Sequence, residues 1–454
     1  VHPYIRRRTG VEPVTYPHPL LEPVLERTLG IPLFQEQLMQ MATTVGNCTA
    51  ADADLLRRAM GSKRRVERID SLCTKLFEGM AANGIDDDTA QGIYARIESF
   101  ANFGFAESHA LSFAGLVYTS AWIKLHYPAV FLAALLRSQP MGFYSSATLV
   151  ADARRHGVVT RRPDVARSSV GADLELLDAC CEELGSEELE TGIDECLHDH
   201  DESEIGAFDP NRDDGDHRRD THFAVRLGLS DVSGISIETA TRIVEERERE
   251  SFVSLDDLAR RVDLSGEEVE ALALAGAFDD LVGSRRGALW QIGQINGVAP
   301  GQLDVQVVTQ PPLLPEPTQM ELLGDDLRAT SISTTDHPVR QVRDALNRRG
   351  VVQVDRLDGV EARRRIEVAG VVTHRQRPGT AGGVTFLNLE DETGLLNVIV
   401  TPGVWRHYRR VARASRALVV RGILERGNEG VMSLQADRLE ALDLSVPTKS
   451  RDFR

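Results

Sequence analysis

An apolar segment that ends at Pro128 is the feature of this chain that most constrains its fold. Ser108 stands where a helix cap is expected, and Pro128, which cannot continue a helix, marks the end. Between them, apolar residues recur at helical spacing: Leu111, Ala114, Tyr118, Ala121, Trp122 and Leu125. The pattern predicts a helix that packs against a core.

The first turn of this predicted helix is also a candidate binding site. It would present Ser108 and His109 beside the flexible Gly104, and the free backbone N–H groups at a helix start favour anions such as phosphates. A core helix with a capping serine and a solvated histidine explains the same spacing. Both interpretations stay open on these residues alone.

The overall composition indicates a globular protein of about three domains. The chain has 454 residues, of which 42% are apolar and 27% charged, enough for several cores. No apolar run reaches the roughly 20 residues of a membrane span, and the N-terminus does not resemble a signal peptide. Five unevenly placed cysteines do not predict a disulfide framework. We therefore expect a cytoplasmic protein that does not contact membranes.

The acidic side chains are concentrated in one stretch. Residues 171–220 hold nineteen acidic side chains against three arginines, a net charge of −16 out of −17 for the whole chain. The rest of the chain is therefore near neutral, with clustered basic residues. Such a polar acidic run predicts a disordered insertion.

Within that stretch lie residues of the types that bind zinc: Cys180, Cys181, Cys196, His198 and His200. Structural zinc sites usually use two short ligand pairs, which this spacing lacks. We predict no metal site here.

Two neighbouring arginines, Arg57 and Arg58, stand near the end of a helix that Asp52 would cap and Met60 would end. Adjacent positions point in different directions on a helix, so both cannot face the core. Lys63 follows in a strongly basic segment. Arginine offers forked donors that suit the oxygens of a triphosphate, so this region is a candidate phosphate-binding site.

Three motifs, in this order, resemble the fingers region of the bacterial C-family DNA polymerases, the α subunits of DNA polymerase III. Residues 30–39 read GIPLFQEQLM, residues 53–61 read ADLLRRAMG, and residues 124–129 read KLHYPA after a phenylalanine- and glycine-rich turn and Ser-His. The resemblance implies that Arg57, Arg58, Lys63 and His109 face the phosphates of the incoming nucleotide.

The same resemblance implies where the chemistry of such a polymerase would lie. In this family the carboxylates that hold two Mg²⁺ ions sit in a palm domain that precedes the fingers. The chain begins at Val1, in mid-motif by this comparison, so we expect the C-terminal portion of a longer enzyme. No catalytic residue is predicted in the chain itself, and we expect it to be inactive alone.

A tight turn at residues 232–236, Val-Ser-Gly-Ile-Ser, resembles a helix-hairpin-helix. The glycine, Gly234, would aim backbone N–H groups at a DNA phosphate without reading bases. Ser236 replaces the second glycine usual in the family and resists a positive φ, which predicts an altered turn. Arg285 and Arg286 on a later basic turn are further candidate DNA contacts. An ordinary helical subdomain remains the alternative.

Residues 296–318, rich in proline and glutamine, predict a linker. Residues 319–323, Gln-Met-Glu-Leu-Leu, loosely fit the peptides that bind sliding clamps. A helix start explains them as well, so clamp binding, direct or indirect, is left open.

The hydrophobic period changes to two in the last part of the chain, which predicts five short strands: 366–372, 384–389, 396–400, 417–424 and 431–439. Five strands with glycine turns suggest a small barrel, and this region resembles the OB-fold attached to these polymerases.

The predicted barrel has few aromatic residues on which bases could stack. Phe386 sits on a strand, and Trp405 and Tyr408 lie on a helical segment that ends at Ala414. That segment also carries a basic stripe: Arg406, Arg409, Arg410 and Arg413. We expect weak, sequence-tolerant single-strand binding, with a protein-docking platform as the alternative.

The chain ends with Ser-Arg-Asp-Phe-Arg, soon after the barrel. This ending resembles the error-prone, damage-inducible branch of the family, which acts in translesion synthesis and DNA repair with mutasome proteins. The expected partners are primer–template DNA, deoxynucleoside triphosphates and mutasome proteins, and the expected cofactor is Mg²⁺ bound by the missing palm.

The predicted fold is multidomain and mainly α, with a C-terminal β-barrel. Its parts are fingers (1–138), a link to a thumb-like region (139–170), the acidic insertion (171–222), a tandem helix-hairpin-helix (223–295), a linker (296–335), the OB-fold (336–446) and a tail (447–454). The rival hypothesis is a stand-alone, non-catalytic DNA-binding protein that reuses these domains.

Overall fold

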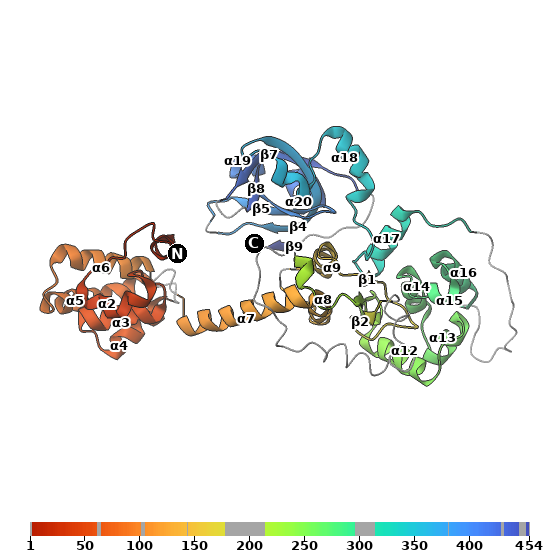
Figure 1. The fold of residues 1–454 in the computed structure, drawn as a ribbon, viewed down its shortest axis with the longest axis horizontal. Helices are drawn as coiled ribbons and strands as arrows, with labels where there is room; N and C mark the ends of the chain where they lie inside the picture. Colours follow the sequence, from red (N-terminus) through yellow and green to blue (C-terminus); the bar gives the residue numbers. More distant parts are fainter. Residues whose placement is uncertain are drawn as a thin grey trace. The chain divides into compact units, whose positions relative to one another are not determined.

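The computed structural model divides into two compact units, Val1–Trp122 and Ile123–Arg454 (Figure 1). It describes residues 2–60, 65–100, 105–142, 144–177, 214–295, 314–379, 381–427, 431–444 and 451–453. Among these residues, no helix combines the length and the apolar character needed to cross a membrane.

The N-terminal unit is built from helices only, as far as the described residues go. They are α1 (His2–Arg8), η1 (Pro19–Leu21), α2 (Glu22–Leu25), η2 (Glu26–Thr28), α3 (Gln35–Gly46), α4 (Ala50–Met60), α5 (Arg65–Ala82) and α6 (Asp87–Phe100). Leu38, Met41 and Val45 of α3 are fully buried in its core. At Gly79 a Cβ would lie 1.9 Å from the carbonyl oxygen of Gly46, so this close approach of α3 and α5 requires glycine at position 79.

The start of α4 differs from the prediction. The helix begins at Ala50, so Asp52 lies in its first turn and is not its cap. The Asp52 carboxylate accepts hydrogen bonds from the backbone N–H (2.8 Å) and hydroxyl (2.6 Å) of Thr49. Together with the Lys75 ammonium, which also bonds to it, these contacts lower the pKa of Asp52 to about 2.

Helix α7 (Glu107–His126) runs across the boundary between the two units and ends before Pro128, as predicted. Ser108 lies inside its first turn, and the Glu36 carboxylate accepts the Glu107 N–H (3.0 Å) instead. The predicted packing of its apolar residues is wrong for the described structure, since Leu111 and Tyr118 are 75% and 79% exposed. The apolar residues surround α7 instead of forming one stripe, so no single face matches a core.

The C-terminal unit begins with a small mixed layer. Helices α8 (Pro128–Arg137) and α9 (Ser146–Arg155) accompany strands β1 (Thr160–Arg161), β2 (Asp173–Leu176) and β3 (Phe223–Arg226). The strand order is β1-β3-β2, with β3 parallel to β1 and antiparallel to β2.

The structure corrects the bounds of the predicted acidic insertion. Strand β2 falls within it, and residues 214–222 are also described, where η4 (Asp214–His217) leads to Asp220. The Asp220 carboxylate accepts the first N–H groups of α8, from Ala129 (2.6 Å) and Val130 (3.2 Å). These acidic residues therefore serve the fold, while residues 178–213, including the cysteines and histidines considered for zinc, lie outside the described residues.

A helical layer follows, with a core of its own. Its elements are η5 (Leu229–Asp231), α12 (Ile237–Arg249), α13 (Leu255–Val262), α14 (Gly266–Leu274), α15 (Asp279–Val282) and α16 (Arg285–Ile295). Serine caps α12, α13 and α14, where Ser236, Ser254 and Ser265 each accept an N–H three residues ahead.

Helix α17 (Gln319–Ala329) leads toward the barrel. Thr318 and Glu321 form a capping box at its start, and Leu323 is buried. The helix start, one of the two explanations for residues 319–323, therefore accounts for their sequence.

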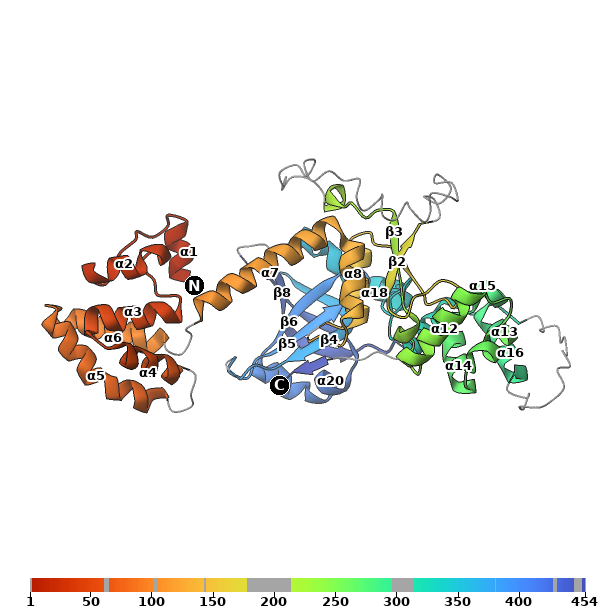
Figure 2. The same cartoon turned by 90° about the horizontal axis from the view of Figure 1, so that it is seen from below.

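A closed five-stranded barrel completes the C-terminal unit (Figure 2). After η6 (Arg340–Val342), α18 (Arg343–Arg349) and η7 (Val354–Gly359), its strands are β4 (Arg365–Gln376), β5 (Thr385–Glu390), β6 (Leu395–Val400), β7 (Ala417–Arg426) and β8 (Met432–Ala441). The strands follow the order β5-β6-β8-β7-β4, and the barrel is closed because β4 also pairs with β5. A further strand, β9 (Arg451–Phe453), pairs with β4 in parallel. All five predicted strands are present, and the mainly α fold with a C-terminal barrel is confirmed.

A buried ion network connects α16, α17 and the segment after β1. The Arg285 guanidinium bonds to the Asp326 carboxylate at 2.5 Å, and the two side chains are 2% and 4% exposed. Arg162 approaches the same carboxylate at 3.5 Å, and the Ser333 hydroxyl donates to it at 3.2 Å. Asp326 thus joins three chain segments that are distant in sequence.

We predict that Asp326→Ala destabilises the C-terminal unit by about 3–5 kcal/mol, because it leaves buried guanidinium groups without a counter-charge. Asp325→Ala is the matched control: Asp325 pairs with Arg328, which is 62% exposed, and loss of such a pair costs about 0–1 kcal/mol. Urea unfolding of both variants measures the difference. Equal midpoints would contradict the role given to Asp326.

Candidate nucleic-acid interface

The turn between η5 and α12 has the form of a helix-hairpin-helix turn. Val232 and Ile235 are buried and anchor it, and the Ile235 N–H donates to the Val232 carbonyl (3.0 Å). Between them Gly234 has φ +95°, a conformation that side-chain-bearing residues rarely adopt. Ser233 and Gly234 are both exposed, but the Ser233 N–H donates to the Ala329 carbonyl (2.7 Å), which leaves the Gly234 N–H as the group of this turn that could donate to a ligand.

Ser236 does not strain this turn. Its φ is −77°, so the positive φ that would have required glycine is not needed. Its hydroxyl accepts the Thr239 N–H (3.0 Å) and caps α12. The predicted alteration of the turn is therefore wrong: the serine replaces the glycine by capping the helix.

The two arginines predicted to contact DNA at the start of α16 have internal partners. Arg285 is buried in the ion network with Asp326, so its guanidinium cannot reach a phosphate at the surface. Arg286 is 29% exposed, and it pairs with Glu321 (2.8 Å) and donates to the Pro315 carbonyl. The prediction is corrected for Arg285, since burial and pairing make it part of the fold.

The basic stripe on the barrel is exposed. Two short helices carry it, α19 (Pro402–His407) and α20 (Arg409–Ala414). Arg406 and Arg409 are both exposed, and no ion pair to either occurs among the described residues. Arg410 and Arg413 are also exposed.

The aromatic residues of this region face the other way. Trp405 and Tyr408 pack against the barrel core, and Phe386 is half-buried on β5 opposite Ile399. Stacking of bases on Trp405 or Tyr408 would require them to leave the core. The surface formed by α19 and α20 therefore presents positive charge to a nucleic acid, whereas its aromatic rings are turned toward the barrel core.

The residues predicted to face the nucleotide are only partly described. Arg57 and Arg58 lie within the bounds of α4, although their side chains are outside the described structure, and Lys63 is outside it altogether. His109 is exposed on the first turn of α7, with its ring between those of Phe105 (5.0 Å) and Phe113 (4.4 Å). The structure does not bring these four residues into a described cluster.

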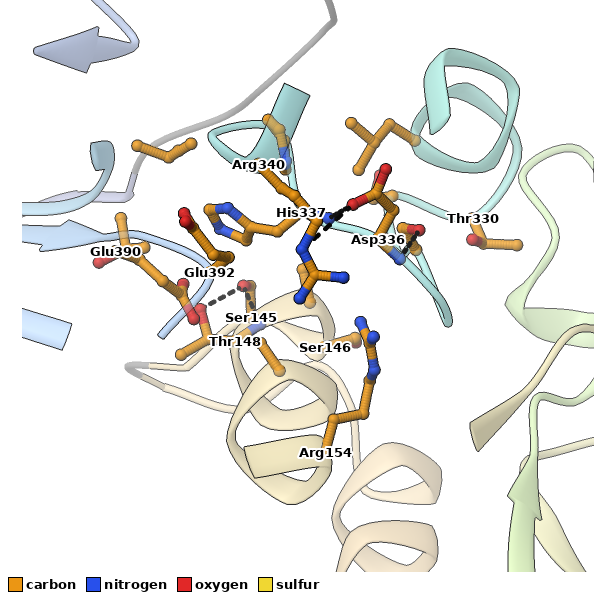
Figure 3. A pocket seen from close by; sticks show the side chains of 18 of the residues that line it. Ser145, Ser146, Thr148, Arg154, Thr330, Asp336, His337, Arg340, Glu390 and Glu392 are labelled. Carbon is orange, nitrogen blue, oxygen red and sulfur yellow. Dashed lines mark hydrogen bonds and ion pairs between the residues drawn. The ribbon is translucent and has the colours of Figure 1, made fainter. Parts of the chain in front are cut away.

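A cavity of about 930 Å³, here called the barrel cavity, was missed by the sequence analysis (Figure 3). It is lined by the start of α9 (145–155), by the segment 327–340, and by Val371, Thr373, His374, Glu390, Glu392 and Arg416 of the barrel. The adjacent arginines Arg154 and Arg155 were the only indication of this cavity in the local sequence, because the three segments that line it are far apart along the chain.

Two groups that line the barrel cavity have shifted pKa values. Burial raises the pKa of Glu390 to about 7, although Arg155 pairs with it at 3.2 Å; Asp152 and Asp391 also raise it. Burial lowers the pKa of His337 to about 4, an effect that Arg155, Arg340 and Arg154 reinforce and Glu392 opposes. Near neutral pH the His337 ring is therefore uncharged.

Three family descriptions match separate parts of the chain. "Bacterial DNA polymerase III alpha subunit finger domain" matches residues 1–84, "Helix-hairpin-helix motif" matches residues 157–288, and "OB-fold nucleic acid binding domain" matches residues 366–442. These matches correspond, in chain order, to the all-helical unit, to the helical layer that contains the hairpin turn (here called the hairpin layer), and to the barrel.

Curated relatives match over the whole chain. Error-prone DNA polymerases of Cutibacterium acnes, Mycolicibacterium paratuberculosis and Mycobacterium tuberculosis are 98%, 47% and 46% identical to it. The chain covers 40%, 38% and 38% of their respective lengths. An asparaginyl-tRNA synthetase structure from Pyrococcus horikoshii is 21% identical with a TM-score of 0.16, and it covers 19% of this chain and 21% of its own. That likeness is too slight to carry an argument.

The matched modules define the class of the protein, a polymerase-type fingers region followed by two nucleic-acid-binding modules. Together with the relatives they confirm the resemblance seen in the sequence. The chain belongs to the bacterial DNA polymerase III alpha subunit family, in its error-prone branch, and spans about 40% of the length of the curated relatives.

We predict opposite pH dependences for the two shifted groups. The pKa of folded Glu390, about 7, exceeds its ordinary 4.5, so the folded state binds the extra proton and stability falls as pH rises between these values. The pKa of folded His337, about 4, is below its ordinary 6.5, so stability rises with pH across that window. In the parent protein the two effects oppose each other where the windows overlap.

The measurement is the urea midpoint of the parent, Glu390→Gln and His337→Gln between about pH 4.5 and 6.5. Relative to the parent, Glu390→Gln should gain stability as pH rises, since only the histidine effect remains, and His337→Gln should lose it. Curves parallel to the parent for both variants would contradict the assignment.

Proposed function

We propose that this chain is the C-terminal portion of an error-prone DNA polymerase that performs DNA-directed DNA synthesis, including synthesis across lesions in DNA repair. The observation that carries the proposal is the alignment of the whole chain with polymerases more than twice its length. A cytoplasmic location is part of the same proposal, supported by the similarity to error-prone DNA polymerases.

In this proposal the chain contributes contacts to DNA and to the incoming nucleotide. The exposed backbone of the hairpin turn at Gly234 would donate to phosphates of duplex DNA without reading bases. The fingers unit would use Arg57, Arg58, Lys63 and His109 for the nucleotide, as the family resemblance implies. Mutasome proteins and a sliding clamp are further proposed partners, supported only by that resemblance.

Nucleotidyl transfer of this kind needs carboxylates that hold two Mg²⁺ ions roughly 4 Å apart. Among the described residues, no group of three or more His, Cys, Asp or Glu side chains is placed to hold a metal ion. The described residues therefore do not fit the metal pair, and we propose that a palm elsewhere in the full-length enzyme binds it.

The experiment that tests the nucleotide contacts replaces Arg57 and Arg58 by alanine in the full-length polymerase. The apparent affinity for deoxynucleoside triphosphate should fall roughly 10- to 150-fold, since a charge-assisted hydrogen bond contributes about 1.5–3 kcal/mol. Binding of primer–template should change little. Steady-state primer extension and DNA titration measure the two effects.

Arg96→Ala, an exposed arginine on α6, is the matched control and should leave nucleotide affinity unchanged. The chain on its own is the negative control and should not extend a primer. Unaltered nucleotide affinity in the Arg57/Arg58 variant would refute the assignment. Incorporation by the isolated chain would refute the placement of the palm.

The second test concerns the barrel. We predict that replacing Arg406 and Arg409 by alanine weakens single-strand binding and reduces the logarithmic salt slope by about 1.4, because each phosphate neutralised contributes about 0.7. Replacing the exposed Arg348 and Arg356 removes the same charge away from the stripe and should leave the slope unchanged. Titration of a labelled oligonucleotide at several salt concentrations measures it. Equal slopes for the two variants would favour the protein-docking alternative for the barrel.

A further inference from the structure

The barrel cavity collects hydrogen-bond donors from three chain segments. Arg154 lines it from α9 and Arg340 from the segment before the barrel (Figure 3). Arg416, directly before β7, lines it as well. Its volume of about 930 Å³ lies within the range of small-molecule sites, roughly 300–1,000 Å³. The question is which ligand chemistry its polar lining would recognise.

The carboxylates that line the barrel cavity are already engaged by other groups. Glu392 accepts the Arg343 guanidinium, with Nη2 at 2.8 Å, and Glu390 pairs with Arg155 at 3.2 Å. Asp336 lies 3.8 Å from the Arg340 guanidinium and also accepts the backbone N–H of His337 (2.8 Å) and the side-chain amide of Gln341. Their negative charge is therefore compensated within the protein.

His337 adds a donor whose direction follows from its hydrogen bonding. Its Nδ1 atom accepts the backbone N–H of Val339 (3.2 Å), so the proton of the uncharged ring resides on Nε2. Neutrality follows from burial, which lowers the pKa of this ring to about 4. His337 thus presents an N–H donor from a ring that lines the cavity.

The start of α9 also opens onto the barrel cavity. Ser145 caps this ten-residue helix by accepting the Thr148 N–H (3.2 Å). Among the described residues, no acceptor is found for the N–H groups of Ser146 and Ala147, which line the cavity. Free N–H groups at a helix start, with the positive end of the helix dipole, favour an anion.

Two guanidinium groups carry charge that no carboxylate in the described structure pairs with. Among the described residues, Arg154 donates to the Thr335 carbonyl (2.7 Å) and makes no ion pair; burial and the nearby charges of Arg340 and Arg155 lower its pKa, and Asp336 only partly opposes them. Arg416 is exposed and makes no ion pair in the described part of the chain. An anion between them would relieve the repulsion at Arg154 and satisfy the helix start.

We propose that the barrel cavity binds a phosphate group, held by Arg154, Arg416, the N–H groups at the start of α9 and the Nε2–H of His337. The shared ligand chemistry is a phosphate oxyanion, in one of two forms: a phosphodiester of a single DNA strand or a free pyrophosphate. The strand form rests on the proposed DNA-contacting function, whereas the pyrophosphate form does not.

The test compares the parent chain with Arg416→Ala and with Arg154→Ala/Arg416→Ala, using pyrophosphate and a labelled oligothymidine as separate probes. Arg348→Ala/Arg356→Ala is the charge-matched control. Arg416 is exposed, and its side chain makes no hydrogen bond or ion pair with the described residues, so its single variant should fold normally. Isothermal titration measures the first probe and fluorescence anisotropy the second.

We expect the single variant to weaken binding of the correct probe about 10-fold and the double variant about 100-fold, with no change in the control. Weakening for pyrophosphate alone assigns a free anion, and weakening for the oligonucleotide assigns a backbone phosphate. The proposal is overturned if the parent binds neither probe, or if the cavity variants and the control behave alike for both.

The test of the barrel cavity and the test of the proposed polymerase function can give different answers. Removal of Arg406 and Arg409 from the basic stripe leaves the barrel cavity intact, so its effect on the salt slope reports on the stripe alone. Suppose that the cavity variants bind both probes like the control, while the Arg406/Arg409 variant shows the expected loss of salt slope. That result refutes this inference and leaves the DNA-contacting role in place.

Discussion

The buried pair between Arg285 and Asp326 is the interaction on which the C-terminal unit depends. It holds α17 against α16, and through the Ser333 hydroxyl it fixes the middle of the segment 327–340 that lines the barrel cavity. Thr334 and Thr335 then bond to Thr160 and Arg154 through their carbonyls. An unpaired charge in the protein interior is costly, so the Arg285 guanidinium must keep its Asp326 partner. This requirement determines the path of the chain from the hairpin layer to the barrel.

The two nucleic-acid modules present phosphate-binding groups in different ways. The hairpin turn offers the backbone N–H of Gly234, in a turn shaped by the positive φ of this glycine and followed by α12, which Ser236 caps. The barrel offers exposed guanidinium groups on α19 and α20, whose aromatic neighbours Trp405 and Tyr408 are used for packing. Neither arrangement depends on the identity of a base, because groups of these kinds bind the phosphate backbone.

Helix α7 shows how an apolar sequence can mislead. Its spacing correctly predicted a helix that ends before Pro128, but Leu111, Leu116 and Tyr118 are exposed in the described structure. Exposed apolar patches of this kind are typical of interaction sites. Hydrophobic periodicity indicates the conformation of a segment but does not determine whether its apolar residues are buried.

By itself, the sequence determined the helical and strand segments, the closed barrel and the family, because these follow from hydrophobic period, glycine and proline positions and long motifs. It could not separate Arg285, which is buried, from Arg286, which is part-exposed, since neighbours in sequence share composition but face different surroundings. It also missed the barrel cavity, whose donors at Arg154, His337 and Arg416 are far apart in the chain. Only the tertiary structure decided these points, because burial and the convergence of distant segments are properties of packing.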